Sequence, residues 1–182
     1  MTNLRTFLGA LILLQGLSAC AVAPTISEKE AATLVDRFCT TLISGVAHYD
    51  PNGNGAWPPN DPKVFGPLLT TELTSFIGEA DALNAAFEAS TKEKGPLGDG
   101  VPWKAYQDEA STCTPGVISG SAEKAEVEIT YSFELAPDTG WTDALVLVRH
   151  EGAWRIDDIR FEKPIYGSGL RTVLSGVLDQ LK

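Results

Sequence analysis

The chain has 182 residues, of which 43% are hydrophobic and 21% are charged, a composition that fits one globular domain and excludes a disordered or collagen-like chain. It carries 24 acidic and 14 basic side chains, for a formal net charge of -10 at pH 7. This charge argues against a partner bound mainly through phosphates or anionic lipid headgroups, and we expect no nucleic acid. The three cysteines and two histidines have no spacing typical of a zinc site, so no cofactor is expected apart from the calcium considered below.

The first 19 residues have the features of a signal peptide. Arg5 is the one charged side chain before a short apolar stretch, which covers about half of the roughly twenty residues needed to span a bilayer. Leu17-Ser18-Ala19-Cys20 follows at once and resembles the bacterial lipobox, in which the chain is cut before the cysteine and the cysteine is acylated. The alternative is a buried cysteine near an ordinary secretory cleavage site.

The lipobox predicts a protein held on a membrane by acyl chains on Cys20. Two or three acyl chains hold a protein essentially permanently, whereas a single chain holds it only marginally. Ala21 stands where lipoproteins retained in the inner membrane often carry Asp, so the resemblance implies the periplasmic face of the outer membrane. We therefore divide the chain into a signal peptide (1–19), an acylated tether (20–26) and a single α+β domain (27–182).

Helical patterns dominate the first half of the domain. Ser27 and Glu30 form a capping box at the start of a helix predicted over 28–47, whose apolar side chains recur every three or four residues. The Gly- and Pro-rich stretch 50–66 predicts irregular structure. A second helix is predicted over 67–91 from its apolar spacing.

A loop is predicted over 92–101 and a short helix or turn around Trp103 and Tyr106, and from Thr112 onwards the pattern changes to the alternation of a strand. Residues 126–135 alternate acidic or hydroxyl side chains with apolar ones, and Leu135 falls on the apolar side. A turn predicted at 137–140 leads to a second strand over 141–150.

A tight hairpin predicted at 151–152 leads into a third strand over 153–161, and a closing helix is predicted over 168–181. Helices followed by a meander of strands indicate the α+β class. We expect the N-terminal helices to pack on one face of a curved antiparallel sheet, together with the C-terminal helix.

Two cysteines remain in the domain once Cys20 is acylated. Cys39 lies on the first predicted helix and Cys113 near the first strand, and an even pair in an oxidising compartment predicts a disulfide. The bond would close a loop of about 75 residues, which the chain-entropy treatment values at roughly 4 to 5 kcal/mol.

Short motifs along the mature chain carry a family resemblance. Besides the two long helices, they are Asp99-Gly100-Val101-Pro102-Trp103, Tyr106-Gln107-Asp108, Trp154-Arg155-Ile156-Asp157-Asp158-Ile159, Leu170-Arg171 and Leu174. These motifs resemble a family of uncharacterised Gram-negative periplasmic proteins and lipoproteins. The resemblance covers most of the mature chain and implies the cone-shaped nuclear transport factor 2-like fold, but it implies no activity. The Gly- and Pro-rich stretch before the second helix departs from the family pattern.

The segment from Asp50 to Asp61 has the spacing of a calcium loop. Oxygen donors stand at its first, third and fifth positions (Asp50, Asn52 and Asn54), a glycine at the sixth and a carboxylate at the twelfth (Asp61). Two prolines prevent the exiting helix from starting inside the loop, and Asp reaches less far than the usual Glu at the twelfth position. A calcium site and a plain Asn/Gly turn both remain open.

An aromatic and acidic patch is expected at the mouth of the cone. Its members are Asp99, Trp103, Tyr106, Gln107 and Asp108. Such a patch could hold a small ligand or a protein partner. The alternative is a helix cap followed by part of an aromatic core.

Asp157 and Asp158 are neighbours in a predicted strand and should point to opposite faces, unless a bulge lies there. One of them, with Asp158 as the candidate, could face the interior of the cone. A buried carboxylate partnered by Arg149, Arg155 or Arg160 is more often structural than catalytic.

These features favour a protein that is not an enzyme, because no G-x-S-x-G motif is present and no sequence feature pairs a histidine with a serine. The leading hypothesis is a non-catalytic lipoprotein that binds another envelope protein or assists its assembly. The alternatives are an immunity protein that blocks a cell-wall-directed toxin, and an enzyme or small-ligand receptor that uses the interior of the cone.

Overall fold

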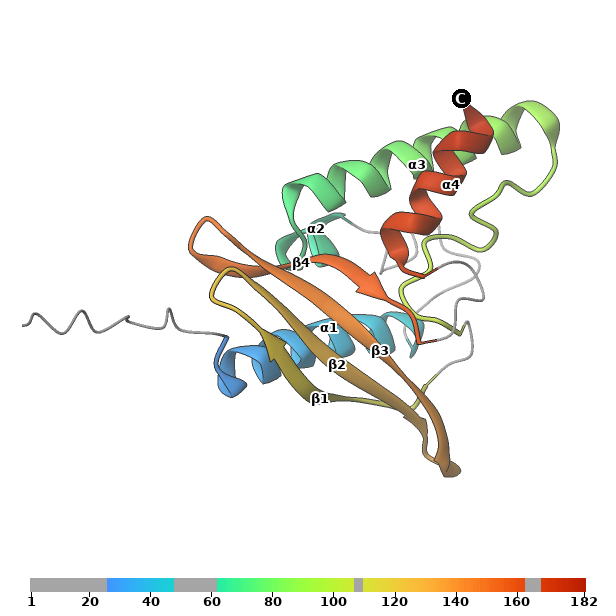
Figure 1. Cartoon of the computed structure of the whole chain (residues 1–182). Helices are drawn as coiled ribbons and strands as arrows, with labels where there is room; N and C mark the ends of the chain where they lie inside the picture. Colours follow the sequence, from blue (N-terminus) through green and yellow to red (C-terminus); the bar gives the residue numbers. More distant parts are fainter. Residues whose placement is uncertain (1–25, 48–61, 107–109, 163–167) are drawn as a thin grey trace, which may run out of the picture.

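The computed structural model describes residues 26–47, 62–106, 110–162 and 168–182 (Figure 1). These residues form an α+β domain with one antiparallel sheet, which confirms the predicted fold class at this level. The elements in chain order are α1 (Glu28–Ala47), α2 (Pro62–Phe65), the 3-10 turn η2 (Gly66–Leu68), α3 (Thr71–Thr91), β1 (Thr112–Gly120), β2 (Lys124–Phe133), β3 (Ala136–His150), β4 (Ala153–Arg160) and α4 (Leu170–Leu181). No helix within these described ranges is both long and apolar enough to cross a membrane.

Helix α1 begins and ends where the sequence predicts. The Glu30 N–H donates to the Ser27 hydroxyl at 3.2 Å and the Ser27 N–H donates to the Glu30 carboxylate at 3.0 Å, so the predicted capping box is present. Ala31, Val35 and Phe38 are fully buried at helical spacing. This stripe packs α1 against the sheet, where its main strand neighbour is β1.

Helix α2 lies inside the Gly- and Pro-rich stretch, so the prediction of irregular structure is wrong over 62–65. Pro62 stands at the first position of the helix, where its missing N–H costs no hydrogen bond. Phe65 is buried, and its ring centroid lies 5.5 Å from that of Phe38 in α1. A contact in the core therefore orders a segment whose local composition disfavours a helix.

The second long helix starts later than predicted. The 67–91 prediction is wrong at its start, because the first residues of that range form η2 and Leu69 is extended and pairs with Ile156 of β4. Thr70 then caps α3, and its hydroxyl accepts a hydrogen bond from the Leu73 N–H at 3.1 Å. The edge of the sheet thus sets the first residue of α3.

The four strands form one sheet in the order β1-β2-β3-β4. Val127 pairs with Leu145, and Leu145 pairs with Ile159, so these fully buried side chains share one face of the sheet. Glu126 and Glu128 of β2 are half-buried on the other face, as the alternation predicts. Helices α3 and α4 pack against each other and against β4, whereas α1 lies across the sheet (Figure 1).

The hairpin between β2 and β3 turns earlier than predicted. Strand β2 ends at Phe133 and β3 begins at Ala136, so the turn lies at Glu134 and Leu135 and not at 137–140. Leu135 is 99% exposed, which contradicts its predicted place on the apolar side. The β2–β3 pairing shifts register between Ser132 and Phe133, and such a shift cannot be deduced from alternation.

The tight hairpin at Glu151 and Gly152 is confirmed, and both residues have positive φ (52° and 79°), as in a type I′ turn. Strand β4 ends at Arg160 and α4 begins at Leu170, close to the predicted bounds. The third strand and the closing helix therefore follow the sequence pattern, apart from their terminal residues.

The predicted disulfide between Cys39 and Cys113 is present, with the two Cα atoms 5.6 Å apart. It joins α1 to β1 across 74 positions of sequence. The bond therefore fixes the first helix against the edge strand of the sheet.

Candidate functional site

The described members of the predicted aromatic and acidic patch do not share one surface. Trp103 is 4% exposed, and its ring centroid lies 4.1 Å from that of Phe65, so it is part of the core. Asp99 is exposed and forms a 2.6 Å salt bridge with Lys94 in the loop after α3. These two predicted site residues therefore have different surroundings.

Tyr106 is half-buried, and its ring centroid lies 5.1 Å from that of Trp141 in β3. Gln107 and Asp108 follow it but lie outside the described residues. Trp141 also stacks on Tyr131, with centroids 4.8 Å apart. Tyr106 thus covers one side of an aromatic cluster on the sheet.

The buried carboxylate of this region is Asp143, which was missed by the sequence analysis. Asp143 is 1% exposed and accepts hydrogen bonds from the backbone N–H groups of Ala105 (2.9 Å) and Glu162 (3.1 Å) and from the Trp141 indole (3.3 Å). Burial raises the pKa of Asp143, although these three hydrogen bonds act in the opposite sense. Asp143 fastens the segments before β1 and after β4 to the sheet. The feature of the sequence that could have indicated this buried residue is the position of Asp143 directly before the apolar residues 144–148.

Asp157 and Asp158 hold α3, β4 and α4 together. The register between β3 and β4 shifts at Asp157, so the bulge that the sequence allowed is present. Arg171 of α4 contacts both residues: its Nη2 donates to Asp157 at 2.6 Å and its backbone N–H donates to Asp158 at 2.9 Å. The Thr70 hydroxyl donates to Asp157 at 3.0 Å. The partner arginine is thus not one of the three that the sequence suggested, because only the fold brings α4 to this bulge.

Asp158 also serves as a cap for α4. Gly169 is the N-cap residue and has no side chain to accept a hydrogen bond, and the Asp158 carboxylate accepts one from the first turn instead. The Asp157–Asp158 pair therefore has a positioning role in the fold.

Some predicted site residues lie outside the described residues. They are Cys20, Asp50, Asn52, Asn54 and Asp61, besides the two patch members named above. Acylation and the calcium loop thus remain predictions. Within the described part of the chain, no three His, Cys, Asp or Glu side chains are grouped as metal ligands would be.

A pocket of about 520 Å³ opens between α1 and the β3–β4 hairpin. Lys29 and Arg37 of α1 and Arg155 of β4 line it with positive charge. Lys29 and Arg37 are eight positions apart, so both lie on the same side of the helix. The apolar part of the wall comes from Leu34, Leu68 and Trp154.

Arg149 of β3 adds a fourth cation beside this pocket. Its Cζ atom lies 5.2 Å from the centre of the Trp154 ring, in a cation–π contact. Glu30 is the one carboxylate among the lining residues. Hydrogen bonds from the Ser27 hydroxyl and N–H hold the pKa of Glu30 below its ordinary value, and the charge of Arg149 lowers it further. Glu30 is therefore an ionised cap of α1.

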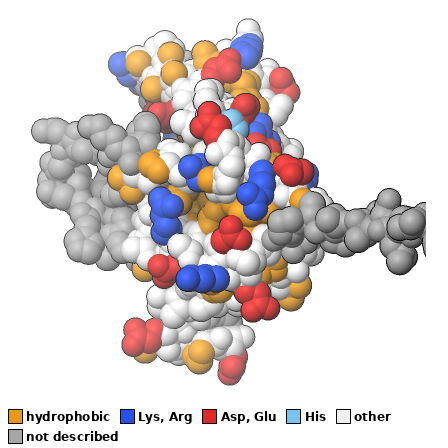
Figure 2. All heavy atoms as spheres, turned by 90° about the vertical axis from the view of Figure 1, so that its left-hand side faces the viewer, with side chains coloured by type: hydrophobic (Ala, Val, Ile, Leu, Met, Phe, Trp, Pro, Cys, Tyr) orange, Lys and Arg blue, Asp and Glu red, His pale blue; other side chains and the backbone are white. Residues whose placement is uncertain are grey.

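The positive charge of the pocket is only partly balanced within the described residues, where the ionised Glu30 stands against the charge of Arg149. None of the salt bridges there involves Lys29, Arg37, Arg149 or Arg155. Figure 2 views the molecule from the left-hand side of Figure 1 and shows Lys and Arg side chains around a small apolar surface, with Asp and Glu side chains among them. A locally cationic pocket thus exists in a chain of net charge -10. We name this feature the cationic pocket.

In comparisons with known proteins, no family model, curated protein or solved structure matches this chain. The geometry of the described residues is therefore the basis for the function proposed below.

Proposed function

We propose that this protein is a non-catalytic lipoprotein, anchored through Cys20 at the periplasmic face of the outer membrane, that binds another envelope protein. The supporting observation is the chemical difference between the two ends of β3. One end is cationic and lies beside the start of α1, and the other end is an exposed apolar turn.

The cationic end of β3 is the end nearest the predicted anchor. Arg149 lies there, close to the first turn of α1. Ile26, the first described residue, is six residue steps from Cys20, and an extended chain spans at most about 3.6 Å per step, or roughly 22 Å. An acylated Cys20 would therefore keep this end of the domain next to the membrane.

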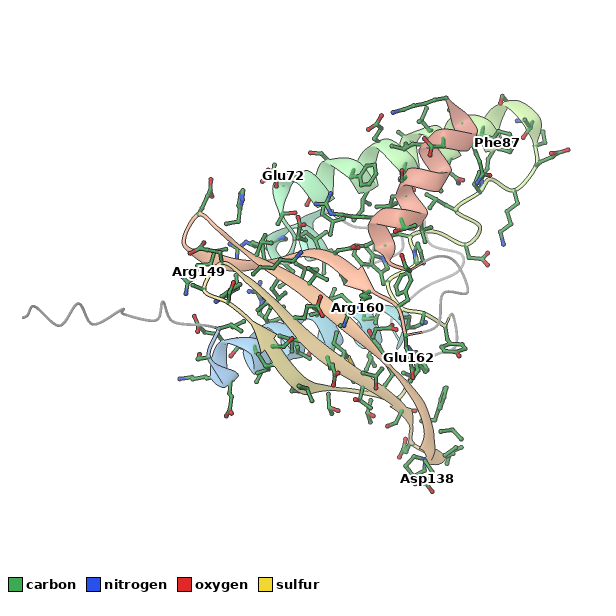
Figure 3. All side chains as sticks on the ribbon, in the orientation of Figure 1. Glu72, Phe87, Asp138, Arg149, Arg160 and Glu162 are labelled. Atoms are coloured by element: carbon green, nitrogen blue, oxygen red, sulfur yellow. A yellow bond between two sulfur atoms is a disulfide. The ribbon has the colours of Figure 1, made fainter. Side chains whose placement is uncertain are left out.

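The distal end of β3 carries the apolar turn. Leu135 is 99% exposed, and Ala136 and Pro137 beside it are also exposed. Strand β3 has 15 residues, which at about 3.3 Å each place this turn on the order of 45 Å from the cationic end. Figure 3 shows Arg149 and Asp138 at opposite ends of the sheet. Among the described residues Leu135 is the most exposed large hydrophobic side chain, and it lies on a projecting hairpin, so we place the partner-binding surface here, at a distance from the membrane.

We also infer that the α+β domain is a variant of the nuclear transport factor 2-like cone. Support comes from the long helix α1 against the inner face of a meandering antiparallel sheet. In the described residues, Phe38, Phe65 and Trp103 fill part of the space where a cone would hold a ligand. This packing favours a binding surface outside the cone over a reaction inside it.

Site-specific crosslinking in cells tests the proposed function. A photoreactive amino acid at position 135 should crosslink the mature protein to one discrete envelope protein. The same amino acid at Glu93, which is exposed in the loop after α3, serves as the control and should give no such product. Equal crosslinking at both positions, or none at position 135, would contradict the proposed binding surface.

The anchor is tested separately. Cys20→Ala should abolish labelling by a fatty-acid probe and leave an unprocessed precursor. Normal processing and labelling of that variant would refute the lipoprotein assignment without bearing on the crosslinking result.

A further inference from the structure

We infer that the cationic pocket binds the phosphate of a phosphate-bearing amphiphile, and that the headgroup of a membrane phospholipid is its source. The assignment of the ligand to a membrane phospholipid rests on the proposed anchoring at Cys20. The chemistry of the pocket is independent of the anchor.

The charges of the pocket match a phosphate. Arg37 and Arg155, both lining residues, carry guanidinium groups, a type of side chain that binds phosphate oxygens through paired N–H donors, and Lys29 adds a compact ammonium charge. The Arg155 Nη1 also donates to the Trp154 carbonyl oxygen at 3.1 Å. The lining carboxylate, Glu30, accepts hydrogen bonds from Ser27 at 2.7 and 3.0 Å. Glu30 stays ionised, but the pocket is lined by three cations and one carboxylate, which leaves positive charge in excess for an external anion.

The size and the apolar wall of the pocket indicate more than a bare phosphate. A volume of about 520 Å³ falls in the range of sites for organic ligands, which is about 300 to 1,000 Å³. Leu34, Leu68 and Trp154 form part of this wall, and each is 2 to 8% exposed, so they add a small apolar contact to a site whose size fits an organic ligand. A phosphate attached to glycerol and the first part of an acyl chain has both features.

Trp154 supplies a second indication of an oxygen-rich ligand. It lines the pocket and is 6% exposed, and its indole Nε1 has no hydrogen-bond acceptor within the described residues. The Nε1 atom is itself covered, so a ligand oxygen reaches it only if binding shifts the ring, and a buried N–H without an acceptor gains from such a contact. Binding should therefore change the environment of this N–H.

The position of the pocket favours a membrane lipid over a soluble ligand. Lys29 lies three residues after Ile26, and Ile26 is at most about 22 Å of extended chain from Cys20. The first turns of α1 would thus lie near the headgroups of the bilayer that holds the acyl chains. A headgroup bound there would orient the domain on the membrane and direct the apolar turn at Leu135 away from it.

The net charge of -10 describes the average over the whole surface, and it is this average that argues against binding through phosphates. At physiological salt, exposed charges more than about 8 Å apart are largely screened. Four cations around one pocket can therefore attract an anion although carboxylates elsewhere on the domain outnumber them.

The test uses the mature acylated protein in micelles of an uncharged detergent, with NMR detection of the tryptophan indole N–H signals. The Trp154 signal is assigned with Trp154→Phe. The ligands are dihexanoyl phosphatidylglycerol, inorganic phosphate, uncharged dihexanoylglycerol and a hexaglutamate peptide. We expect the phospholipid to shift the Trp154 signal with a Kd at least about tenfold below that of inorganic phosphate, and dihexanoylglycerol to cause no shift.

Matched charge variants complete the test. Arg37→Gln/Arg155→Gln should raise the Kd for the phospholipid at least about tenfold. Lys92→Gln/Lys94→Gln, in and beside the exposed loop after α3, changes the net charge equally and should leave the Kd unchanged. Melting temperatures of both variants show whether the fold is intact.

Each remaining outcome overturns part or all of the inference. Equal affinity for inorganic phosphate and phospholipid would assign the pocket to free phosphate and overturn the lipid source. Tighter binding of hexaglutamate, or an unchanged Kd in the folded arginine variant, would overturn the phosphate site itself. Crosslinking at position 135 is independent of all these results, so failure of this inference is distinguishable from failure of the proposed function.

Discussion

Arg171, in the first turn of α4, holds Asp157 in the bulge of β4 through two contacts. Its Nη2 lies 2.6 Å from Asp157 Oδ1, and its Nε donates to the Asp157 carbonyl oxygen at 2.6 Å. Because Asp157 also binds the Thr70 hydroxyl at the start of α3, the ion pair fixes both helices against the edge of the sheet.

Replacement of Arg171 should therefore destabilise the domain. Arg171→Met is expected to lower the free energy of unfolding by about 1 to 2 kcal/mol, because a charge-assisted pair with two contacts is lost. Arg160→Met is the control, since Arg160 pairs with Glu126 at 2.6 Å but its side chain is 55% exposed. That change should cost less than about 0.5 kcal/mol in urea unfolding. Equal losses would show that the junction at Asp157 has no special role.

The disulfide should contribute a large share of the stability. We expect Cys39→Ala/Cys113→Ala to lower the free energy of unfolding by about 2 to 5 kcal/mol, because the closed loop restricts the unfolded chain. Reductant should destabilise the wild-type protein in urea unfolding and leave the double variant unchanged. Two free thiols in protein isolated from the periplasm would contradict this expectation.

The buried Asp143 predicts a pH-dependent difference between variants. Burial raises its pKa above the ordinary value of 3.8, so the folded protein binds more protons than the unfolded chain between these two values. The stabilisation that Asp143 gives through this difference in proton binding is fully present below about pH 3.8. It is lost as the pH rises through the pKa of Asp143 in the folded protein.

Asp143→Asn is the variant that isolates this effect. The Asn side chain does not titrate, and its amide N–H would face one of the three N–H groups that donate to Asp143. We therefore expect Asp143→Asn to lower the free energy of unfolding by about 1 to 3 kcal/mol at acidic pH. The stability advantage of the wild type over Asp143→Asn, measured in urea at a series of pH values, should become smaller as the pH rises toward 7. An advantage that grows with pH would contradict the direction of the pKa shift.

Gly78 and Gly169 should respond in opposite ways to alanine. Gly78 is exposed in the middle of α3, and an added Cβ there would meet no atom within 4 Å, so Gly78→Ala should raise the free energy of unfolding by about 0.5 to 1 kcal/mol. A Cβ at Gly169 would lie 2.9 Å from the Ile159 carbonyl oxygen, so Gly169→Ala should be destabilising. Thermal unfolding of the two variants measures both signs.

Features that depend on neighbouring residues follow from the sequence. The Ser27–Glu30 capping box starts α1 where it was predicted, and Glu151-Gly152 forms the predicted hairpin, because each uses contacts within a few residues. The even count of cysteines likewise predicted the bond between Cys39 and Cys113. Local chemistry thus determined the α+β class and the bounds of α1, whereas α2, the start of α3 and a separate strand β1 were not predicted.

Features that depend on contacts between distant segments were decided only by the tertiary structure. Leu69 is extended because it pairs with Ile156, and a bulge turns Asp157 toward Arg171. The cationic pocket is the clearest case, because it brings Lys29 and Arg37 of α1 together with cations of β3 and β4 that lie more than about a hundred positions later in the chain. Hydrophobic alternation and capping signals describe how each segment folds, but the packing of α1 against the sheet determines which charged side chains meet.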